Sequence, residues 1–187
     1  MIMVYLFLKD GFEEMEALVT TDILRRAGIK VLLVGERIVT GSHGIAVQAD
    51  IPYDAVNLAD AEMLVLPGGL RGVNNLWADD RVRKLLTDAD ARGIKLAAIC
   101  AAPTILGKLG LLQGKLAVCY PGAGKLAGAN TSHGASVVTD GRITTGKAAG
   151  TSYAFALELA RILTDSATAE KVRAEMYAGE PAPVIRA

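Results

Sequence analysis

Cysteine, histidine and aromatic residues are scarce in this chain of 187 residues. Cys100 and Cys119 are its two cysteines, and aromatic residues make up 5% of the sequence. Two cysteines are too few for a disulfide framework, so we expect the reducing environment of the cytoplasm. The two histidines, His43 and His133, lie far from each other and from both cysteines in the sequence, which is no metal-site pattern, and we expect no metal.

An excess of charge of either sign is absent as well. Twenty lysine and arginine residues balance 20 aspartate and glutamate residues, and no block of like charge occurs. We therefore expect neither nucleic acid nor a membrane surface as a partner. The N-terminal apolar run ends at Lys9 and Asp10. It is too short to cross a bilayer and has no basic leader or cleavage site, so it predicts a first strand.

Hydrophobic residues form 51% of the chain, enough to bury a full core, and the length predicts one domain over residues 1–187. Strands are predicted at 3–8, 31–34, 63–66, 96–99 and 115–119, and helices at 13–27, 81–92, 101–109, 151–163 and 167–177. Their alternation predicts an α/β fold whose parallel sheet is covered on both faces. Residues 38–47 and 137–144 predict small antiparallel additions, and we expect the tail from Gly179 to pack irregularly or fray.

Cys100 stands directly after the predicted strand 96–99. Pro103, a residue favoured in the first turn of a helix, follows two alanines later. Cys100 is therefore expected on a sharp strand-to-helix turn, where α/β hydrolases carry their nucleophile. Backbone N–H groups and the positive end of the next helix would favour the thiolate, which is the reactive form. The alternative is a small buried core residue, the usual fate of a free cysteine.

Glu16 is the acidic residue of interest in the first predicted helix. It shares a core-facing stripe with Val19 and Ile23, whereas Glu13 and Glu14 are explained by the preference for acids at a helix start. A carboxyl group on an apolar face tends to keep its proton. Because neighbouring parallel strands end at the same edge of a sheet, this carboxyl can donate a hydrogen bond to the cysteine or act as general acid or base. The alternative is a glutamate that reaches water from the edge of the stripe.

The predicted strand 63–66 ends in Pro67, Gly68 and Gly69. Glycines at the carboxyl end of a strand let the backbone approach a ligand closely. The N–H groups of Gly69 and Ala101 can then form an oxyanion hole. A plain turn explains the same three residues equally well.

Four segments together resemble the ThiJ/PfpI superfamily, and within it the branch that contains the human parkinsonism-associated deglycase and bacterial YajL. They are residues 11–16, 65–69, 97–103 and 150–152, in the family's order and spacing, and the resemblance covers essentially the whole chain. It implies a homodimer and a flavodoxin-like three-layer α/β/α sandwich with a mostly parallel central sheet. It also implies that Cys100 is the nucleophile and Glu16 its protonated partner, with backbone N–H groups from Gly69 and Ala101.

The chain departs from the family pattern after the next strand. Many superfamily members have a His-Pro step there, whereas this chain has Tyr120 followed by proline. Because the reference pKa of tyrosine is about 10, Tyr120 is a poor base near neutral pH, and proteolysis is not expected. His43 stands where the human family member has an arginine near the partner subunit's site. It either serves that site across a dimer or is a solvated surface residue.

Two residues are expected to have no chemical role. His133 is predicted to be exposed in a Thr-Ser-His-Gly loop, and Cys119 is predicted to be a core residue on the face opposite Tyr120. Gly68, Tyr120 and His43 remain candidates for lining the site.

The resemblance implies a cytoplasmic enzyme without a cofactor. It would act through Cys100 on small α-dicarbonyls such as methylglyoxal, as a glutathione-independent glyoxalase, or on glycated protein, as a deglycase. The second hypothesis is not enzymatic: Cys100 oxidises to a sulfinate that hydrogen-bonds Glu16, and the protein serves as a peroxide sensor or stress chaperone. Both hypotheses use the same residues.

Overall fold

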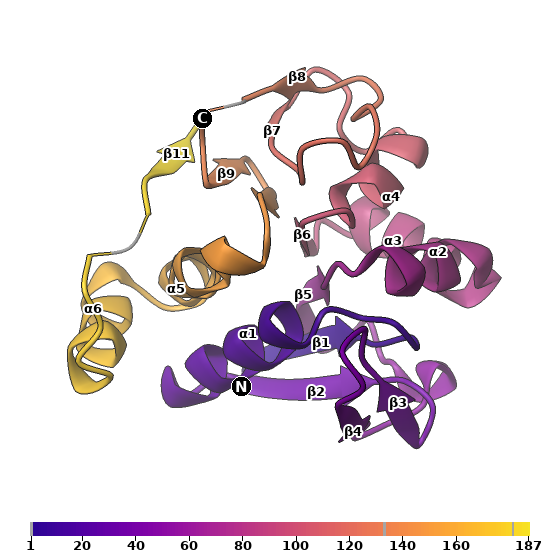
Figure 1. Cartoon of the computed structure of the whole chain (residues 1–187), viewed down its shortest axis with the longest axis horizontal. Coiled ribbons are helices and arrows are strands. Elements are labelled where there is room, and N and C mark those ends of the chain that lie inside the picture. The colour runs from indigo at the N-terminus through magenta and orange to yellow at the C-terminus, as the bar shows by residue number, and fades with distance from the viewer. Residues whose placement is uncertain (1, 133, 181) are drawn as a thin grey trace.

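A computed structural model describes residues 2–132, 134–180 and 182–187. Its centre is a seven-stranded sheet formed by β1 (Met3–Phe7), β2 (Lys30–Val34), β5 (Ala61–Leu66), β6 (Lys95–Ile99), β9 (Val137–Asp140), β10 (Ile143–Gly146) and β11 (Val184–Arg186). The strand order is β11-β9-β10-β6-β5-β1-β2 (Figure 1). Every neighbouring pair is parallel except β9 with β10, so the predicted parallel sheet is confirmed.

Helices cover both faces of this sheet. One face carries α2 (Leu70–Ala78), α3 (Asp80–Ala91) and α4 (Pro103–Lys108), and the other carries α1 (Glu14–Arg26), α5 (Ser152–Leu163) and α6 (Ser166–Glu175). Side chains alternate along each strand, so Tyr5 and Phe7 of β1 face the first layer while Val4 and Leu6 face the second. The three-layer sandwich is therefore confirmed. Among the described residues, no helix is long and apolar enough to cross a membrane.

Local sequence signals set several helix ends. Gly28 and Gly93 follow α1 and α3 with φ of 77° each, a conformation that favours glycine after a helix. Asp79 accepts a hydrogen bond from the Arg81 N–H and caps α3. Pro103 occupies the first turn of α4, as predicted. The prediction for 38–47 is confirmed by β3 (Ile38–Thr40) and β4 (Ala46–Gln48), which form a small antiparallel sheet.

The second half of the chain differs from the prediction at two places. The hairpin of β9 and β10 is part of the central sheet, because β10 pairs in parallel with β6. Since β10 occupies that edge, segment 115–119 contributes only β7 (Leu116–Ala117), which pairs with β8 (Asn130–Thr131) outside the central sheet. The predicted strand at 115–119 is thus largely wrong.

The C-terminal tail is also more ordered than predicted. Its strand β11 pairs with β9, and the Arg186 guanidinium lies 2.8 Å from the buried carboxyl group of Glu158 on α5. Arg161 binds the same carboxyl at 2.8 Å. The prediction of an irregular tail from Gly179 is wrong for this strand, because an ion pair distant in sequence holds it.

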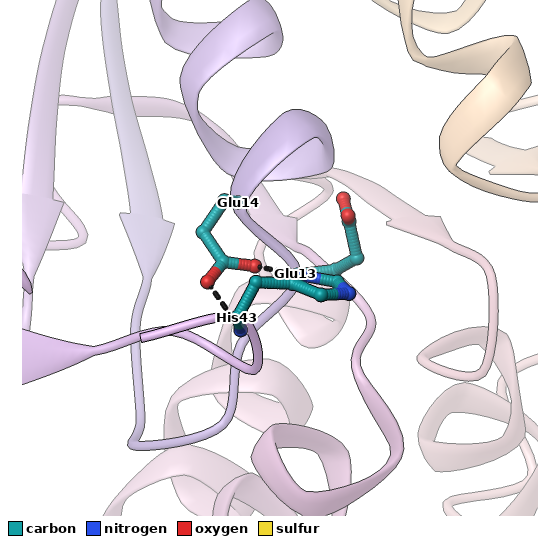
Figure 2. Close-up of side chains that lie close together, drawn as sticks. All are labelled: Glu13, Glu14 and His43. Carbon is teal, nitrogen blue, oxygen red and sulfur yellow. Dashed lines mark hydrogen bonds and ion pairs between the residues drawn. The ribbon is translucent and has the colours of Figure 1, made fainter. Parts of the chain in front are cut away.

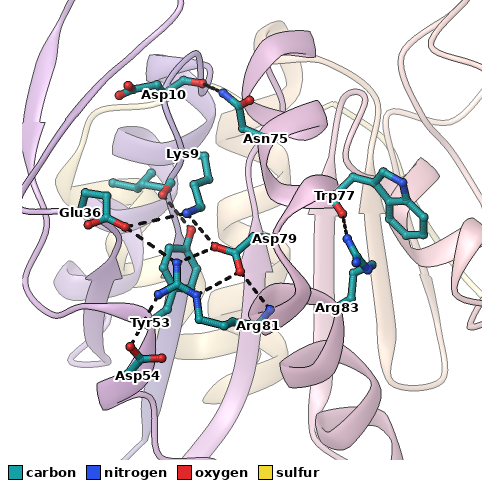
Figure 3. Close-up of polar contacts among 11 residues, drawn as sticks. Lys9, Asp10, Glu36, Tyr53, Asp54, Asn75, Trp77, Asp79, Arg81 and Arg83 are labelled. Atoms are coloured by element: carbon teal, nitrogen blue, oxygen red, sulfur yellow. Dashed lines mark hydrogen bonds and ion pairs between the residues drawn. The ribbon is translucent and has the colours of Figure 1, made fainter.

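A network of charged side chains ties the end of β1 to the start of α3 (Figure 3). Lys9 Nζ lies 2.8 Å from the Asp79 carboxyl, and both side chains are largely buried. Arg81 binds the same carboxyl through two nitrogens, at 2.7 and 3.0 Å. The ring of Tyr53, from the 3₁₀ turn η1 (Tyr53–Ala55), lies 4.5 Å from Lys9 Nζ. These contacts place the β1 end and the α2–α3 junction relative to each other.

Candidate active site

Cys100 lies on the tight turn between β6 and α4. Its φ is 64°, a left-handed conformation that is strained for a residue with a side chain. The Cys100 N–H donates to the carbonyl of Gly146 at 3.0 Å, and the Cys100 carbonyl accepts from the Tyr120 N–H at 2.8 Å. The strained residue is thus held from β10 on one side and from the segment after β7 on the other, which gives the strand-to-helix turn expected from the sequence.

Glu16, on the first turn of α1, is 1% exposed. Its Oε2 accepts a hydrogen bond of 2.6 Å from the Gly68 N–H, whereas the buried Oε1 has no hydrogen-bond partner among the described residues. Burial raises the pKa of Glu16 to about 7, against the lowering effect of the bonds from Gly68 and Cys100. A buried carboxyl group with one unpaired oxygen favours the protonated form. The alternative in which Glu16 reaches water is excluded.

Gly68 allows the thiol and the carboxyl group to meet. A Cβ on Gly68 would lie 2.6 Å from the Cys100 Cβ, 2.6 Å from Glu16 Oε2 and 3.1 Å from the Cys100 sulfur. The next residue, Gly69, has a φ of 82°, and a Cβ there would lie 2.3 Å from the carbonyl oxygen of Gly11. Neighbouring atoms approach both positions so closely that only glycine fits. The alternative of a plain turn does not explain this requirement.

The titration of Cys100 depends on its neighbours. Burial and the adjacent Glu16 carboxylate raise the pKa of Cys100 to about 12, while backbone hydrogen bonds from Gly69 and Ala101 lower it. The lowered pKa predicted from the sequence is wrong while Glu16 is ionised, because burial and the carboxylate together outweigh these two N–H donors and α4 has only six residues. Its repulsion disappears when Glu16 is protonated. The two groups therefore titrate as one coupled pair.

The three elements of this site meet at one edge of the sheet. Glu16 follows β1, Gly68 follows β5 and Cys100 follows β6, and all three lie beyond the carboxyl ends of these strands. From β1 the sheet continues to β2 on one side and to β5 on the other, which makes this edge the topological switch point of the sheet. Open α/β sheets bind ligands at such points.

A cavity of about 340 Å³ opens beside Cys100. Its lining consists of Leu70, Cys100, Ala101, Tyr120, Pro121, Gly122 and Ala123. The volume suits a small molecule, and the side chains around it are mostly apolar. Tyr120 is half-exposed at its rim, as expected for a lining residue. Pro121, Gly122 and Ala123 were not predicted as lining residues, although their position directly after Tyr120 in the chain indicates it.

His43 lies away from this cavity, in the turn between β3 and β4, and is not among the residues that line it. Its Nδ1 is 2.7 Å from Glu14 Oε2, and its backbone N–H donates to Glu14 Oε1 at 2.6 Å (Figure 2). The hydrogen bond and the charge of Glu14 raise the pKa of His43. A role of His43 across a dimer stays a prediction, and His133 lies outside the described residues.

Cys119 is partly buried and packs at the edge of the core, so its expected core position is only partly realised. It lines a second cavity of about 360 Å³, which shares Tyr120, Pro121 and Gly122 with the first. Burial raises the pKa of the Cys119 thiol. Among the described residues, no carboxyl group contributes to the pKa shift of Cys119, whereas Glu16 contributes to that of Cys100.

Comparisons with known proteins agree with this architecture. Residues 2–162 match the DJ-1/PfpI family. The chain is 37% identical over 170 residues to the Drosophila melanogaster protein dj-1beta, covering 88% of this chain and 91% of that protein. It is 30% identical to a protein named deglycase from Pyrococcus abyssi, covering 82% of this chain and 95% of that protein.

Similarity extends to three dimensions. The crystal structure of a cysteine-to-alanine mutant of a DJ-1 superfamily protein from Salmonella typhimurium superposes with a TM-score of 0.89 at 36% identity, covering 96% of this chain and 100% of that chain. Residues 2–162, which match the family, contain every strand from β1 to β10 and the turn that carries Cys100. The resemblance seen in the sequence is thus confirmed, and the chain belongs to the DJ-1/PfpI (ThiJ/PfpI) family.

Proposed function

We propose that this chain is a cysteine-dependent enzyme without a cofactor that acts on small α-dicarbonyls or on their protein adducts. The observation that carries the proposal is the contact of Cys100 with Glu16 across Gly68, at the mouth of a small apolar cavity. The relative named deglycase supports an enzymatic function of this kind. The volume of about 340 Å³ favours a small dicarbonyl, or the modified end of a side chain, over a folded substrate.

In the proposed reaction, the reactive pair carries one proton, which resides on Glu16 while the sulfur is a thiolate. The N–H groups of Gly69 and Ala101 offset the charge on the sulfur. The thiolate attacks the aldehyde carbon of the dicarbonyl, and a C–S bond forms as the C=O π electrons move to oxygen. Glu16 protonates that oxygen, and the product is a hemithioacetal on Cys100.

The carboxylate left on Glu16 can then act as a base. Removal of the hydrogen on the former aldehyde carbon and its return to the neighbouring carbonyl carbon convert the hemithioacetal into a thioester of a 2-hydroxy acid. Attack by water breaks the C–S bond, releases the 2-hydroxy acid and restores the thiol. No net oxidation or reduction occurs, because one carbon gains the hydrogen that the other loses, and no external electron acceptor is needed.

A cysteine protease mechanism has less support at this site. It needs a base that is placed to activate the thiol and protonate an amine leaving group. Tyr120 lies at the cavity, but a tyrosine is a poor base near neutral pH. His43 is held by Glu14 and does not line the cavity. We therefore favour dicarbonyl chemistry.

The second candidate function is peroxide sensing. A protonated Glu16 can donate a hydrogen bond to an oxygen of a sulfinate on Cys100, which would stabilise the oxidised form. If this is the main role, peroxide should oxidise Cys100 to the sulfinate while the purified protein turns over no dicarbonyl.

The proposed enzymatic function is tested by methylglyoxal consumption and 2-hydroxy acid formation with purified protein. Cys100→Ser should lower the rate by roughly a thousandfold or more, because the nucleophile is lost. Cys119→Ser is the matched control and should keep the rate of the unmodified protein. Equal turnover by the Cys100→Ser variant and the unmodified protein would overturn the proposal.

A further inference from the structure

The turn between β3 and β4 is built around the carboxyl group of Glu14. The side chain of Glu14 is 6% exposed and accepts hydrogen bonds from the His43 N–H at 2.6 Å, from the His43 ring at 2.7 Å and from Ser42 Oγ at 3.1 Å. A Cβ on Gly41 would lie 2.3 Å from Glu14 Oε1, so only glycine lets the turn approach this closely. These contacts hold the imidazole of His43 in one position, although its side chain is 71% exposed.

Glu13 stands beside this pair (Figure 2). One donor atom of each of Glu13, Glu14 and His43 lies within 4.8 Å of the other two. Glu13 Oε2 also accepts from the Glu16 N–H at 2.8 Å, which fixes its carboxyl group at the start of α1. The three side chains therefore converge from two segments. Backbone N–H groups hold Glu13 and Glu14, and Glu14 in turn holds the His43 ring.

The negative charge of this group has little compensation. In the part of the chain that the structure describes, neither Glu13 nor Glu14 forms an ion pair with a lysine or arginine, and His43 is the one basic side chain paired with Glu14. The positive end of α1 offsets some of the charge. Hydrogen bonds from His43 and Ser42 supply the remaining contacts of the Glu14 carboxyl group.

We propose that Glu13, Glu14 and His43 form a binding site for a divalent transition-metal cation of the Zn²⁺ type. Imidazole and carboxylate are ligands that Zn²⁺ accepts, and three protein ligands leave its fourth position open. A bound ion would link the β3–β4 turn to the start of α1.

Only small movements are needed to close this site. Two donors at about 2.1 Å from a tetrahedral ion lie about 3.4 Å apart. The Nδ1 of His43 and Oε2 of Glu14 are hydrogen-bonded at 2.7 Å, so the Nδ1 proton must leave and the two atoms must move slightly apart before both can bind the ion. The remaining approach requires rotation of the exposed imidazole and of the Glu13 side chain, which must loosen its hydrogen bond from the Glu16 N–H. Because the buried Glu14 need not move, the core under the turn stays intact.

The test uses a variant without thiols, Cys100→Ser/Cys119→Ser, so that Zn²⁺ cannot bind to sulfur. Calorimetric titration with Zn²⁺ alone should give one ion per chain, and Zn²⁺ should raise the midpoint of thermal unfolding. Adding His43→Ala or Glu13→Gln should weaken binding by about tenfold or more and remove most of the thermal shift. His133→Ala, at the other histidine, is the matched control and should bind as before.

Both substituted ligands are at least partly exposed, and circular dichroism checks that the variants fold. Absence of Zn²⁺ binding to the thiol-free variant would overturn the proposal, as would unchanged affinity in the His43→Ala and Glu13→Gln variants. The outcome is independent of dicarbonyl turnover, since the nucleophile is absent throughout.

Discussion

Cys100 and Glu16 meet across the missing side chain of Gly68. A Cβ at that position would lie 2.6 Å from the β-carbon of Cys100 and 2.6 Å from the carboxyl oxygen of Glu16. The N–H of Gly68 also binds this oxygen at 2.6 Å. One glycine thus sets both the distance between the reacting groups and the orientation of the acid, so its replacement is a sharp test of the pair.

Gly68→Ala should separate the thiol from the carboxyl group. We expect dicarbonyl turnover to fall by about a hundredfold or more, because the acid leaves its position, and the free energy of unfolding to fall by about 1–3 kcal/mol. Gly179→Ala is the control, since nothing lies within 4 Å of a Cβ there. Turnover in Gly68→Ala equal to that of the control would show that the contact is irrelevant to the reaction.

The pH dependence of alkylation reports where the shared proton resides. The pair should lose its first proton near pH 7, because burial raises the pKa of Glu16 to about 7. If the charge then resides on sulfur, the rate of Cys100 alkylation by iodoacetamide should rise through about pH 7 and level off. Peptide mass spectrometry should find Cys100 modified before Cys119. A rate that keeps rising beyond about pH 9, without a plateau, would place the charge on Glu16 instead.

Glu16 should also make the stability of the fold depend on pH. Its pKa is raised from 4.5 to about 7 on folding, so its favourable contribution is present below about pH 4 and is lost as the pH rises through 7. Relative to the unmodified protein, Glu16→Gln should therefore gain up to about 3 kcal/mol in unfolding free energy between about pH 4 and about pH 8. Urea denaturation at both pH values measures this, and a constant difference between the two proteins would contradict it.

The ionised carboxyl group of Asp79 should stabilise the fold near neutral pH, whereas that of Glu16 destabilises it. Its hydrogen bonds with Arg81 outweigh burial and hold the pKa of Asp79 below its usual range, with further support from Lys9. Asp79→Ala should cost about 2–3 kcal/mol of unfolding free energy near neutral pH, because it removes the cap of α3 and leaves Lys9 with a contact of 4.0 Å to the exposed Glu36 in place of its 2.8 Å bond to Asp79. The cost should shrink as the pH falls below about 4, where Asp79 ionisation no longer favours the fold. Asp60→Ala, outside the network, is a suitable control.

Much of the fold could be predicted because its signals are local. Apolar runs, the glycines after α1 and α3, and Pro103 each act within a few residues, and they predicted the parallel sheet and the turn at Cys100. The carboxyl of Glu16 could be predicted from its position on an apolar helix stripe. Each of these features depends on a short segment of the chain, so it can be predicted from one sequence.

The remaining features depend on contacts between distant segments. The β11 strand is held by Arg186 and Glu158, which are 28 residues apart, and no local pattern in the tail indicates this pair. Glu14 was explained by its place at a helix start, yet it is buried and bound by His43, 29 residues away. The pKa of Cys100 could not be predicted from its turn alone, because burial and the adjacent Glu16 raise it more than the turn's own N–H donors lower it.

The most direct test of the central claim, attack of Cys100 on a dicarbonyl with Glu16 as proton carrier, is detection of the adduct. In Glu16→Gln the thiol remains and water can supply the proton for the first step, whereas the later transfer between the two carbons lacks its base, so the hemithioacetal should accumulate. With isotope-labelled methylglyoxal, the carbon NMR spectrum of this variant should contain a hemithioacetal signal. That signal should disappear when Cys100→Ser is added. A signal that persists without Cys100, or its absence from Glu16→Gln, would contradict the account.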